Sequence, residues 1–227
     1  MAVTLPLLDG RQAHLVFTDR SHGDLGRDAA ATERDVRRAR VAPLPWTSLA
    51  QVHGSSVVEV TAPGEHADNE ADAAVTAATG AVLAVHTADC APVALIADSG
   101  ALAVVHVGWK GLYEGVVERS VERLRSLAGG PYRAVLGPCI HPECYRFSEP
   151  DLVPLVERFG PVVRSRTSAG EPALDLPAAV TVALERETVA LVTGHTACTA
   201  CGGRWYSHRA RGDRERQALV AWIERSG

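Results

Sequence analysis

The most apolar part of the chain runs from residue 81 to residue 111 and contains three short hydrophobic runs. These runs are Ala81–His86, Pro92–Ala97 and Ala101–Val107, and each is rich in valine, leucine and alanine. Turn-forming segments at 89–92 and 98–100 separate them. A short continuous apolar run bounded by turn signals is typical of a strand that is buried on both faces. We therefore predict three buried strands in the core of the protein.

The rest of the chain alternates between helix-like and strand-like segments. Apolar residues at 112, 116, 117, 121, 124 and 127 recur at helical spacing and predict an amphipathic helix that packs on the sheet. Segments 47–54 and 55–60 have extended character, and we predict that they form a hairpin with His53 at its tip. Further helices are predicted at 29–40, 149–160 and 174–187, and further strands at 13–18, 71–76, 133–136, 188–193 and 218–223. This order predicts an α/β (α+β) fold.

Composition limits the number of domains and the kinds of partner. A chain of 227 residues with 46% hydrophobic residues can bury one sizeable core, so we expect a single domain over residues 1–227. The net charge of −4 and the isoelectric point near 6.1 give no overall basic field for nucleic acid. The chain has neither a signal-peptide pattern nor an apolar run near the roughly eighteen residues of a membrane helix. We expect a soluble cytoplasmic protein, with a monomer slightly favoured.

The central stretch also carries the most reactive side chains. Cys90 lies between the first two core strands, and His106 lies near the end of the third. With His53 they supply one sulfur and two nitrogens, a set that in zinc enzymes leaves a fourth position for water or substrate. A nucleophilic cysteine with its base and ordinary core residues are the alternatives, and the residue types leave all three open. Asp89 and Asp72 are candidates for orienting a histidine, for binding substrate, or for capping turn amides.

Several cations and further cysteines extend the set of candidates. Lys110, Arg20 and Arg209 are the cations expected near an anionic substrate such as phosphate, although each taken singly is most often a surface residue. Cys139 lies in a Gly-Pro turn, where a cysteine could line a pocket. Cys139, His141 and Cys144 form one weak cluster, and Cys198 and Cys201 form a separate C-x-x-C without a partner pair at zinc-ribbon spacing. The odd total of five cysteines suits free thiols or metal ligands.

Several motifs in a fixed order resemble one family, the bacterial multicopper polyphenol oxidoreductase or laccase-domain proteins, also called peptidoglycan editing factor. The matching segments span residues 17 to about 222. They are Gln51-Val52-His53-Gly54, Ala71-Asp72-Ala73, Thr87-Ala88-Asp89-Cys90-Ala91-Pro92-Val93, Val105-His106-Val107-Gly108-Trp109-Lys110-Gly111, Leu136-Gly137-Pro138-Cys139-Ile140, Leu174-Asp175-Leu176, Cys198-Thr199 and Tyr206-Ser207-His208-Arg209. Taken together, these motifs make the resemblance highly specific.

The resemblance implies a layered α/β/α domain with a central mixed sheet, similar to a toxin deamidase domain. It implies a zinc ion held by Cys90, His53 and His106. The implied activities are phosphorolysis of adenosine, inosine and methylthioadenosine to the base and a ribose 1-phosphate, with adenosine deamination beside it. The chain departs from the family pattern in a shortened loop at 19–28, in Lys110 where arginine is usual, and in Ala210.

Two other functions compete with this one. A copper-dependent polyphenol oxidase is suggested by the family's older name, but blue-copper sites commonly use an axial methionine, and the only methionine here is Met1. The nine histidines never form the His-x-His pairs common in multicopper clusters. A binding module that uses the metal only to stabilise its fold is the non-catalytic alternative.

Overall fold

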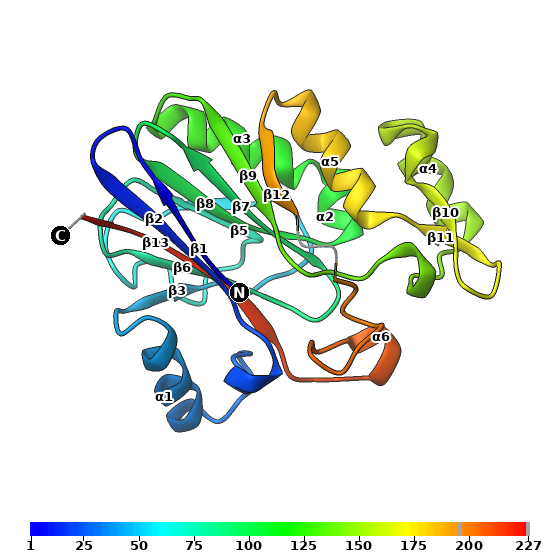
Figure 1. The fold of residues 1–227 in the computed structure, drawn as a ribbon, viewed down its shortest axis with the longest axis horizontal. Helices are drawn as coiled ribbons and strands as arrows, with labels where there is room; N and C mark the ends of the chain where they lie inside the picture. The colour runs from blue at the N-terminus through cyan, green and yellow to red at the C-terminus, as the bar shows by residue number, and fades with distance from the viewer. Residues whose placement is uncertain (195–196, 226–227) are drawn as a thin grey trace.

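The computed structural model describes residues 1–194 and 197–225, and most of its strands lie in two sheets (Figure 1). The five-stranded sheet has the order β1 (Ala2–Pro6), β2 (Arg11–Phe17), β13 (Gln217–Arg225), β6 (Val82–Thr87) and β3 (Trp46–Ser48). The six-stranded sheet has the order β12 (Ala190–Gly194), β9 (Tyr132–Leu136), β7 (Ala91–Ala97), β8 (Ala101–Val107), β5 (Ala73–Thr76) and β4 (Val57–Glu59). A short pair, β10 (Arg164–Arg166) and β11 (Pro172–Leu174), is separate.

Alternation along the buried strands explains why the two sheets stack. On β7, Ala94 and Ile96 contribute to a core shared with Leu15 and Leu83 of the five-stranded sheet. The intervening Val93 and Leu95 belong to a second core on the opposite face. Side chains of a strand point alternately to the two faces of a sheet, so a continuously apolar strand can serve two cores at once.

Helices cover the outer faces of both sheets (Figure 1). The helices α2 (Trp109–Glu114), α3 (Val116–Leu127), α4 (Glu149–Phe159) and α5 (Leu176–Arg186) bury apolar residues in the core beside the six-stranded sheet. The helix α1 (Ala31–Val41) lies by the five-stranded sheet, and α6 (His208–Arg211) is a single turn near the C-terminal strand. Among the described residues, no helix is both long enough and apolar enough to cross a membrane.

The α/β class predicted from the sequence and the mixed strand pairing implied by the resemblance are confirmed. Most pairs are antiparallel, whereas β12 with β9, β3 with β6 and β4 with β5 are parallel. The strands divide between two stacked sheets, where the resemblance implied one central sheet. The predicted helix after residue 111 is interrupted at Gly115, whose φ of 90° lies in the left-handed region that glycine adopts at little cost. The similarity to a toxin deamidase domain stays a prediction.

The predicted hairpin around His53 is wrong. The strand before His53, β3, pairs with β6 of the five-stranded sheet, while the strand after it, β4, pairs with β5 of the six-stranded sheet. The intervening segment therefore crosses from one sheet to the other. Sequence alone could not reveal this crossing, because the partners of each strand are far away in the chain.

Candidate active site

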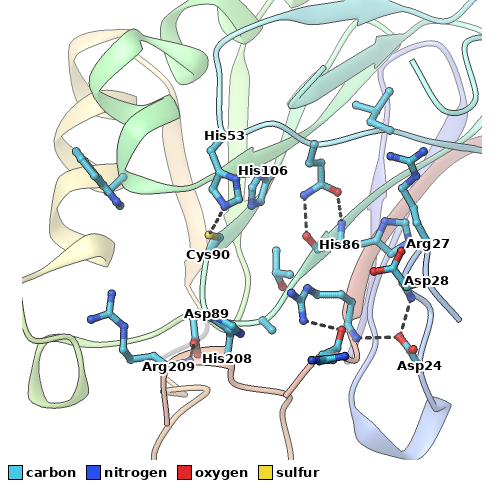
Figure 2. Close-up of a pocket in the computed structure, with 18 of the residues that line it drawn as sticks. Asp24, Arg27, Asp28, His53, His86, Asp89, Cys90, His106, His208 and Arg209 are labelled. Carbon is cyan, nitrogen blue, oxygen red and sulfur yellow. Dashed lines mark hydrogen bonds between the residues drawn. The ribbon is translucent and has the colours of Figure 1, made fainter. Parts of the chain in front are cut away.

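His53, Cys90 and His106 come from three separate elements and meet at one edge of the fold. His106 lies in β8, Cys90 lies immediately before β7, and His53 lies in the segment that crosses between the sheets. All three line a cavity of about 560 Å³. Figure 2 shows their side chains converging, with the Cys90 sulfur facing the His53 ring.

The donor atoms of these three residues fit a metal ion. The Cys90 Sγ and His53 Nε2 are 3.8 Å apart, and the ligand atoms of the three residues all lie within 4.8 Å of one another. The His53 and His106 rings meet edge to face, with centroids 4.8 Å apart. One thiolate and two imidazoles suit zinc, and three protein ligands leave a fourth position open.

Asp72 is fully buried and binds the ring of His106 and the backbone of His53. Its Oδ1 lies 2.8 Å from His106 Nδ1, which leaves Nε2 of that ring to face the cavity. The same carboxylate accepts hydrogen bonds from the backbone N–H groups of Val52, His53 and Gly54 at 3.2, 3.0 and 2.7 Å. These bonds stabilise the left-handed backbone of His53, whose φ is 60°. Asp72 thus orients the site without lining the cavity.

The opposite charges of Cys90 and His106 stabilise one another. Burial opposes ionisation of the Cys90 thiol, but the neighbouring imidazoles of His106 and His53 outweigh it and lower the pKa of Cys90 to about 6. Burial likewise disfavours the imidazolium of His106, yet the Cys90 thiolate and the Asp72 carboxylate raise the pKa of His106 to about 9. A thiolate is therefore available near neutral pH, as a metal ligand requires.

Two glycines after β8 make room for this arrangement. A Cβ atom on Gly108 would lie 2.8 Å from the His53 ring and 3.3 Å from the Cys90 sulfur. A Cβ atom on Gly111 would lie 2.6 Å from the Gly54 carbonyl oxygen, a contact that only a backbone shift could relieve. The glycines of this motif therefore permit the close approach of the His53 segment to the start of α2.

Asp89 connects the site to the C-terminal part of the chain. Its carboxylate accepts a hydrogen bond of 2.6 Å from the Thr199 hydroxyl and one of 2.7 Å from the Arg209 backbone N–H. Its φ of 100° is unusual for a residue other than glycine, and such strain persists only where surrounding contacts hold it. Asp89 lines the cavity, but its carboxylate is committed to positioning its neighbours.

The residues predicted to bind an anionic substrate have different surroundings. Arg209 lines the cavity, and its guanidinium lies over the Tyr145 ring. Lys110 is exposed, lies 5.6 Å from the centroid of the Trp109 ring, and is not among the lining residues. Cys139 is buried beside Cys198 and also lies outside the lining.

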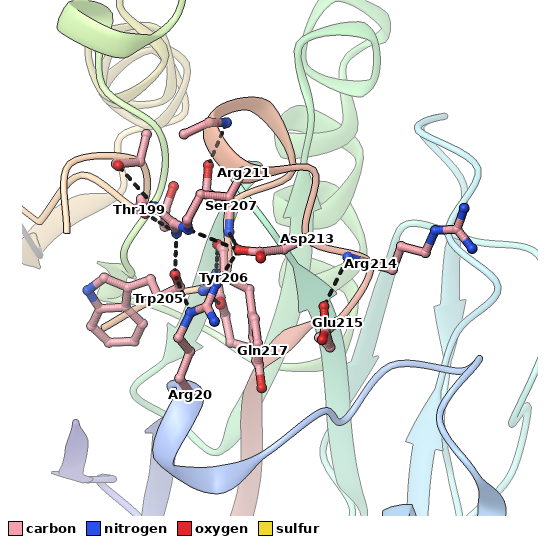
Figure 3. A network of polar contacts seen from close by, with 12 residues as sticks. Arg20, Thr199, Trp205, Tyr206, Ser207, Arg211, Asp213, Arg214, Glu215 and Gln217 are labelled. Carbon is pink, nitrogen blue, oxygen red and sulfur yellow. Dashed lines mark hydrogen bonds and ion pairs between the residues drawn. The ribbon is translucent and has the colours of Figure 1, made fainter. Parts of the chain in front are cut away.

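Arg20 does not line the cavity and belongs instead to a network of polar contacts with the C-terminal part of the chain (Figure 3). Its guanidinium forms an ion pair with Asp213, donates to the Trp205 carbonyl at 3.2 Å and lies 4.6 Å from the centroid of the Tyr206 ring. Asp213 also accepts a bond from the Ser207 backbone N–H at 2.8 Å. Arg20 therefore contacts the chain on both sides of Arg209, through Trp205 and Tyr206 before it and Asp213 after it.

Sequence reasoning missed several residues that line the cavity. Asp24, Arg27 and Asp28 come from the shortened loop, and they lie across the cavity from Asp89 and Arg209 (Figure 2). The polar, glycine-containing character of that loop was the available signal, since such loops often carry binding side chains. The other missed residues include six aromatic or cationic side chains: His86, Trp109, Tyr145, His208, Arg214 and Arg216.

His86 is buried with its Nε2 atom lacking a hydrogen-bond partner among the described residues. Burial, followed by the positive charges of Arg38, Arg34, His106 and Arg216, lowers the pKa of His86 to about 3 from its ordinary 6.5. Protonation of the His86 imidazole is thus unfavourable in the folded protein, whereas the same imidazole in the unfolded chain is protonated below about pH 6.5.

We therefore expect His86 to weaken the fold as the pH falls from about 6.5 towards 3. The stability that its neutral form contributes is fully present above the unfolded pKa and is lost through that window. Urea unfolding of the wild type and of His86→Leu at several pH values measures the effect, and the wild type should lose more stability on acidification. Parallel pH curves for the two proteins would contradict the assignment.

Comparison with known proteins assigns this chain to a protein family. The family model described as multi-copper polyphenol oxidoreductase laccase matches residues 17–224. The chain belongs to this family. The match includes every lining residue of the cavity, so membership covers the candidate site as well as the fold.

Two similar proteins are both named purine nucleoside phosphorylase. Purine nucleoside phosphorylase SCO2081 of Streptomyces coelicolor is 35% identical over 93% of this chain and 96% of its own length. Purine nucleoside phosphorylase Rv2149c of Mycobacterium tuberculosis is 36% identical over 88% of this chain and 82% of its own length.

Solved structures support the fold. The Neisseria meningitidis protein NMB0706 superposes with a TM-score of 0.81 at 24% identity, covering 98% of this chain and 99% of that one. YlmD from Geobacillus stearothermophilus gives a TM-score of 0.79 at 24% identity, covering 97% and 94%.

Proposed function

We propose that this protein is a zinc-dependent purine nucleoside phosphorylase with adenosine deaminase activity. The observation that carries the proposal is the grouping of Cys90, His53 and His106 within 4.8 Å at a cavity that cationic side chains also line. The name of the relatives, purine nucleoside phosphorylase, supports the same reaction class. Adenosine, inosine and methylthioadenosine are the proposed substrates.

Cys90, His53 and His106 would hold the zinc ion, with Asp72 keeping the His106 ring in place. When bound there, zinc would supply a Lewis acid and lower the pKa of a coordinated water for deamination. The residues of the chain contribute orientation: Asp72 binds the His106 imidazole and the backbone N–H of His53, and the neighbouring loops form the walls of the cavity.

Arg209 is the proposed principal phosphate contact, because it is a cation that lines the cavity and Asp89 holds its backbone at 2.7 Å. In phosphorolysis a phosphate oxygen forms a bond to ribose C1′ while the bond from C1′ to the purine nitrogen breaks. The electron pair of that bond leaves with the base, which takes up a proton. Holding phosphate and ribose in line is the main contribution expected of the protein.

Aromatic side chains and His86 suit the base of the nucleoside. Trp109 and Tyr145 line the cavity and offer flat apolar surfaces on which a purine can stack. The unpartnered Nε2 of His86 offers a hydrogen bond to the base or to the ribose.

The decisive experiment is to incubate the protein with adenosine, inosine or methylthioadenosine, with and without phosphate, and to separate the products. We expect free base and ribose 1-phosphate only when phosphate is present. Inosine formed from adenosine without phosphate reports deamination. Absence of every product in both conditions would refute the proposal.

Replacing Arg209 with alanine is expected to depress phosphorolysis far more than deamination, because only the first reaction contains phosphate. Loss of one charge-assisted contact corresponds to about 2–3 kcal/mol, or roughly 30- to 150-fold in kcat/KM for phosphate. The matched variant is Lys110→Ala, which removes an exposed cation outside the lining residues. A larger phosphorolysis loss in Lys110→Ala than in Arg209→Ala would transfer the phosphate contact to Lys110.

The family description also names copper, so metal identity needs its own measurement. Among the described residues, the two groups able to hold a metal contain two histidines between them, far fewer than a multicopper cluster requires. Elemental analysis of protein produced without added copper, beside a phenol oxidation assay, separates the two activities. Stoichiometric copper with turnover of the phenol would favour the oxidase.

A further inference from the structure

A second group of potential metal ligands lies apart from the candidate active site. It comprises Cys144, at the end of the 3₁₀ turn Pro142–Cys144, together with Cys198 and Cys201. The three sulfur atoms lie within 4.8 Å of one another, and the Cys144 and Cys201 sulfurs are 3.3 Å apart. The sequence motifs kept Cys144 separate from the C-x-x-C pair, and only the fold joins them.

Backbone contacts bring the two cysteine-bearing segments together. Cys139 and Cys198 form an isolated parallel bridge, in which the Thr199 N–H donates to the Cys139 carbonyl at 3.0 Å. The His141 N–H donates to the Cys198 sulfur at 3.4 Å. Arg211 donates to the carbonyl oxygens of Thr199 and Ala200, both at 3.1 Å. The cysteines are therefore held close by the surrounding chain, not by their own contacts alone.

A fourth donor is present beside the sulfurs. The Glu143 Oε1 atom lies 3.4 Å from the Cys201 sulfur, which donates its S–H to this carboxylate. The same oxygen lies 3.9 Å from His141 Nδ1, so the imidazole can support the carboxylate from its other side. The His141 Nε2 atom is buried and has no partner among the described residues. Glu143 is thus placed to complete a four-ligand set.

We propose that Cys144, Cys198, Cys201 and Glu143 form a structural zinc site, distinct from the candidate active site. Three thiolates favour a borderline-soft ion such as Zn²⁺, and four protein ligands close the coordination sphere as in structural sites. Tetrahedral Zn–S bonds of about 2.3 Å require sulfurs roughly 3.8 Å apart. The sulfur separations require only small side-chain shifts, whereas the Glu143 carboxylate, which is close to Cys201 but outside the group of donors within 4.8 Å of one another, must turn towards the other two sulfurs. Binding would release the three thiol protons to solvent.

The position of this site gives it a role in the architecture of the cavity. Tyr145, the residue after Cys144, lines the cavity. Thr199, the residue after Cys198, donates to Asp89, which in turn holds Arg209. A metal that joins the two segments would thereby fix one wall of the cavity. The inference rests on the cysteine geometry and is independent of the reaction proposed above.

Metal content in a variant that lacks the first site tests the proposal. In the His53→Ala/Cys90→Ser background, one zinc ion per chain is expected by elemental analysis of protein purified with zinc. Adding Cys201→Ser should remove that ion, whereas adding Cys139→Ala, the loss of a buried cysteine outside the group, should leave it. Less than about a tenth of a zinc per chain in the background protein would overturn the proposal.

Two further measurements test Glu143 as the fourth ligand and exclude a disulfide between Cys144 and Cys201. Glu143→Gln should weaken zinc retention against a chelator at least about tenfold, whereas His141→Ala should weaken it less. The reverse order would overturn the assignment of Glu143.

Thiol titration of unfolded, metal-free protein should recover all the cysteines of the variant. A Cys144–Cys201 disulfide in freshly purified protein, seen as a loss of two thiols and two mass units without zinc, would also overturn the proposal.

Discussion

Replacing His53 with alanine is expected to remove the active-site metal and to lower phosphorolysis about 10³-fold. His53 supplies one of only three donor atoms, and a metal Lewis acid contributes several kcal/mol to a transition state, so a loss of about 4 kcal/mol is reasonable. The His53 side chain is exposed, and its removal leaves no buried polar group without a hydrogen-bond partner. The variant should therefore stay folded. Product formation, zinc content and circular dichroism measured on the same sample check the three expectations.

His14→Ala is the matched control for this variant. His14 lies on β2, stacks on Trp222 and does not line the cavity, so its removal should leave both zinc content and turnover unchanged. A folded His53→Ala protein with wild-type turnover would exclude the proposed metal site. Unfolding of His53→Ala on loss of its zinc would instead support the non-catalytic module, in which metal binding supplies folding free energy.

Replacing Asp72 with alanine is expected to destabilise the protein by on the order of 3–5 kcal/mol, the cost of breaking a buried charged pair. The buried carboxylate accepts bonds from three successive backbone N–H groups and from His106. Its removal would leave these donors unpaired and would release the segment that carries His53. Urea unfolding measures the free energy, and chelator competition should show zinc affinity reduced about 10- to 100-fold.

Asp98→Ala provides the comparison for Asp72. Asp98 forms a 2.5 Å ion pair with Arg133 but remains partly exposed, so we expect its loss to cost no more than about 1 kcal/mol. If the two alanine variants lost similar amounts of stability, Asp72 would be an ordinary ion-pair partner and its role in holding the histidines would be wrong. Asp72→Asn, which preserves size but not charge, should fall between the wild type and Asp72→Ala in zinc affinity.

The sequence by itself determined the strands of the core and the reactive residues at the ends of those strands. The runs that became β6, β7 and β8 are apolar at nearly every position, and such runs form buried strands in almost any α/β context. Cys90 and His106 were identifiable because reactive side chains stand out against that apolar background. The helical spacing after residue 111 likewise predicted the buried face of α3.

Only the tertiary structure decided which distant residues meet. Pairing of β3 with β6 and of β4 with β5 sends His53 between two sheets, and no local pattern encodes a partner so far away in the chain. The fold places Arg20 on Asp213 and puts the shortened loop at the cavity. It also brings Cys144 to Cys198 and Cys201. Periodicity reports the environment of each residue, whereas a site depends on long-range contacts that the packing of both sheets creates.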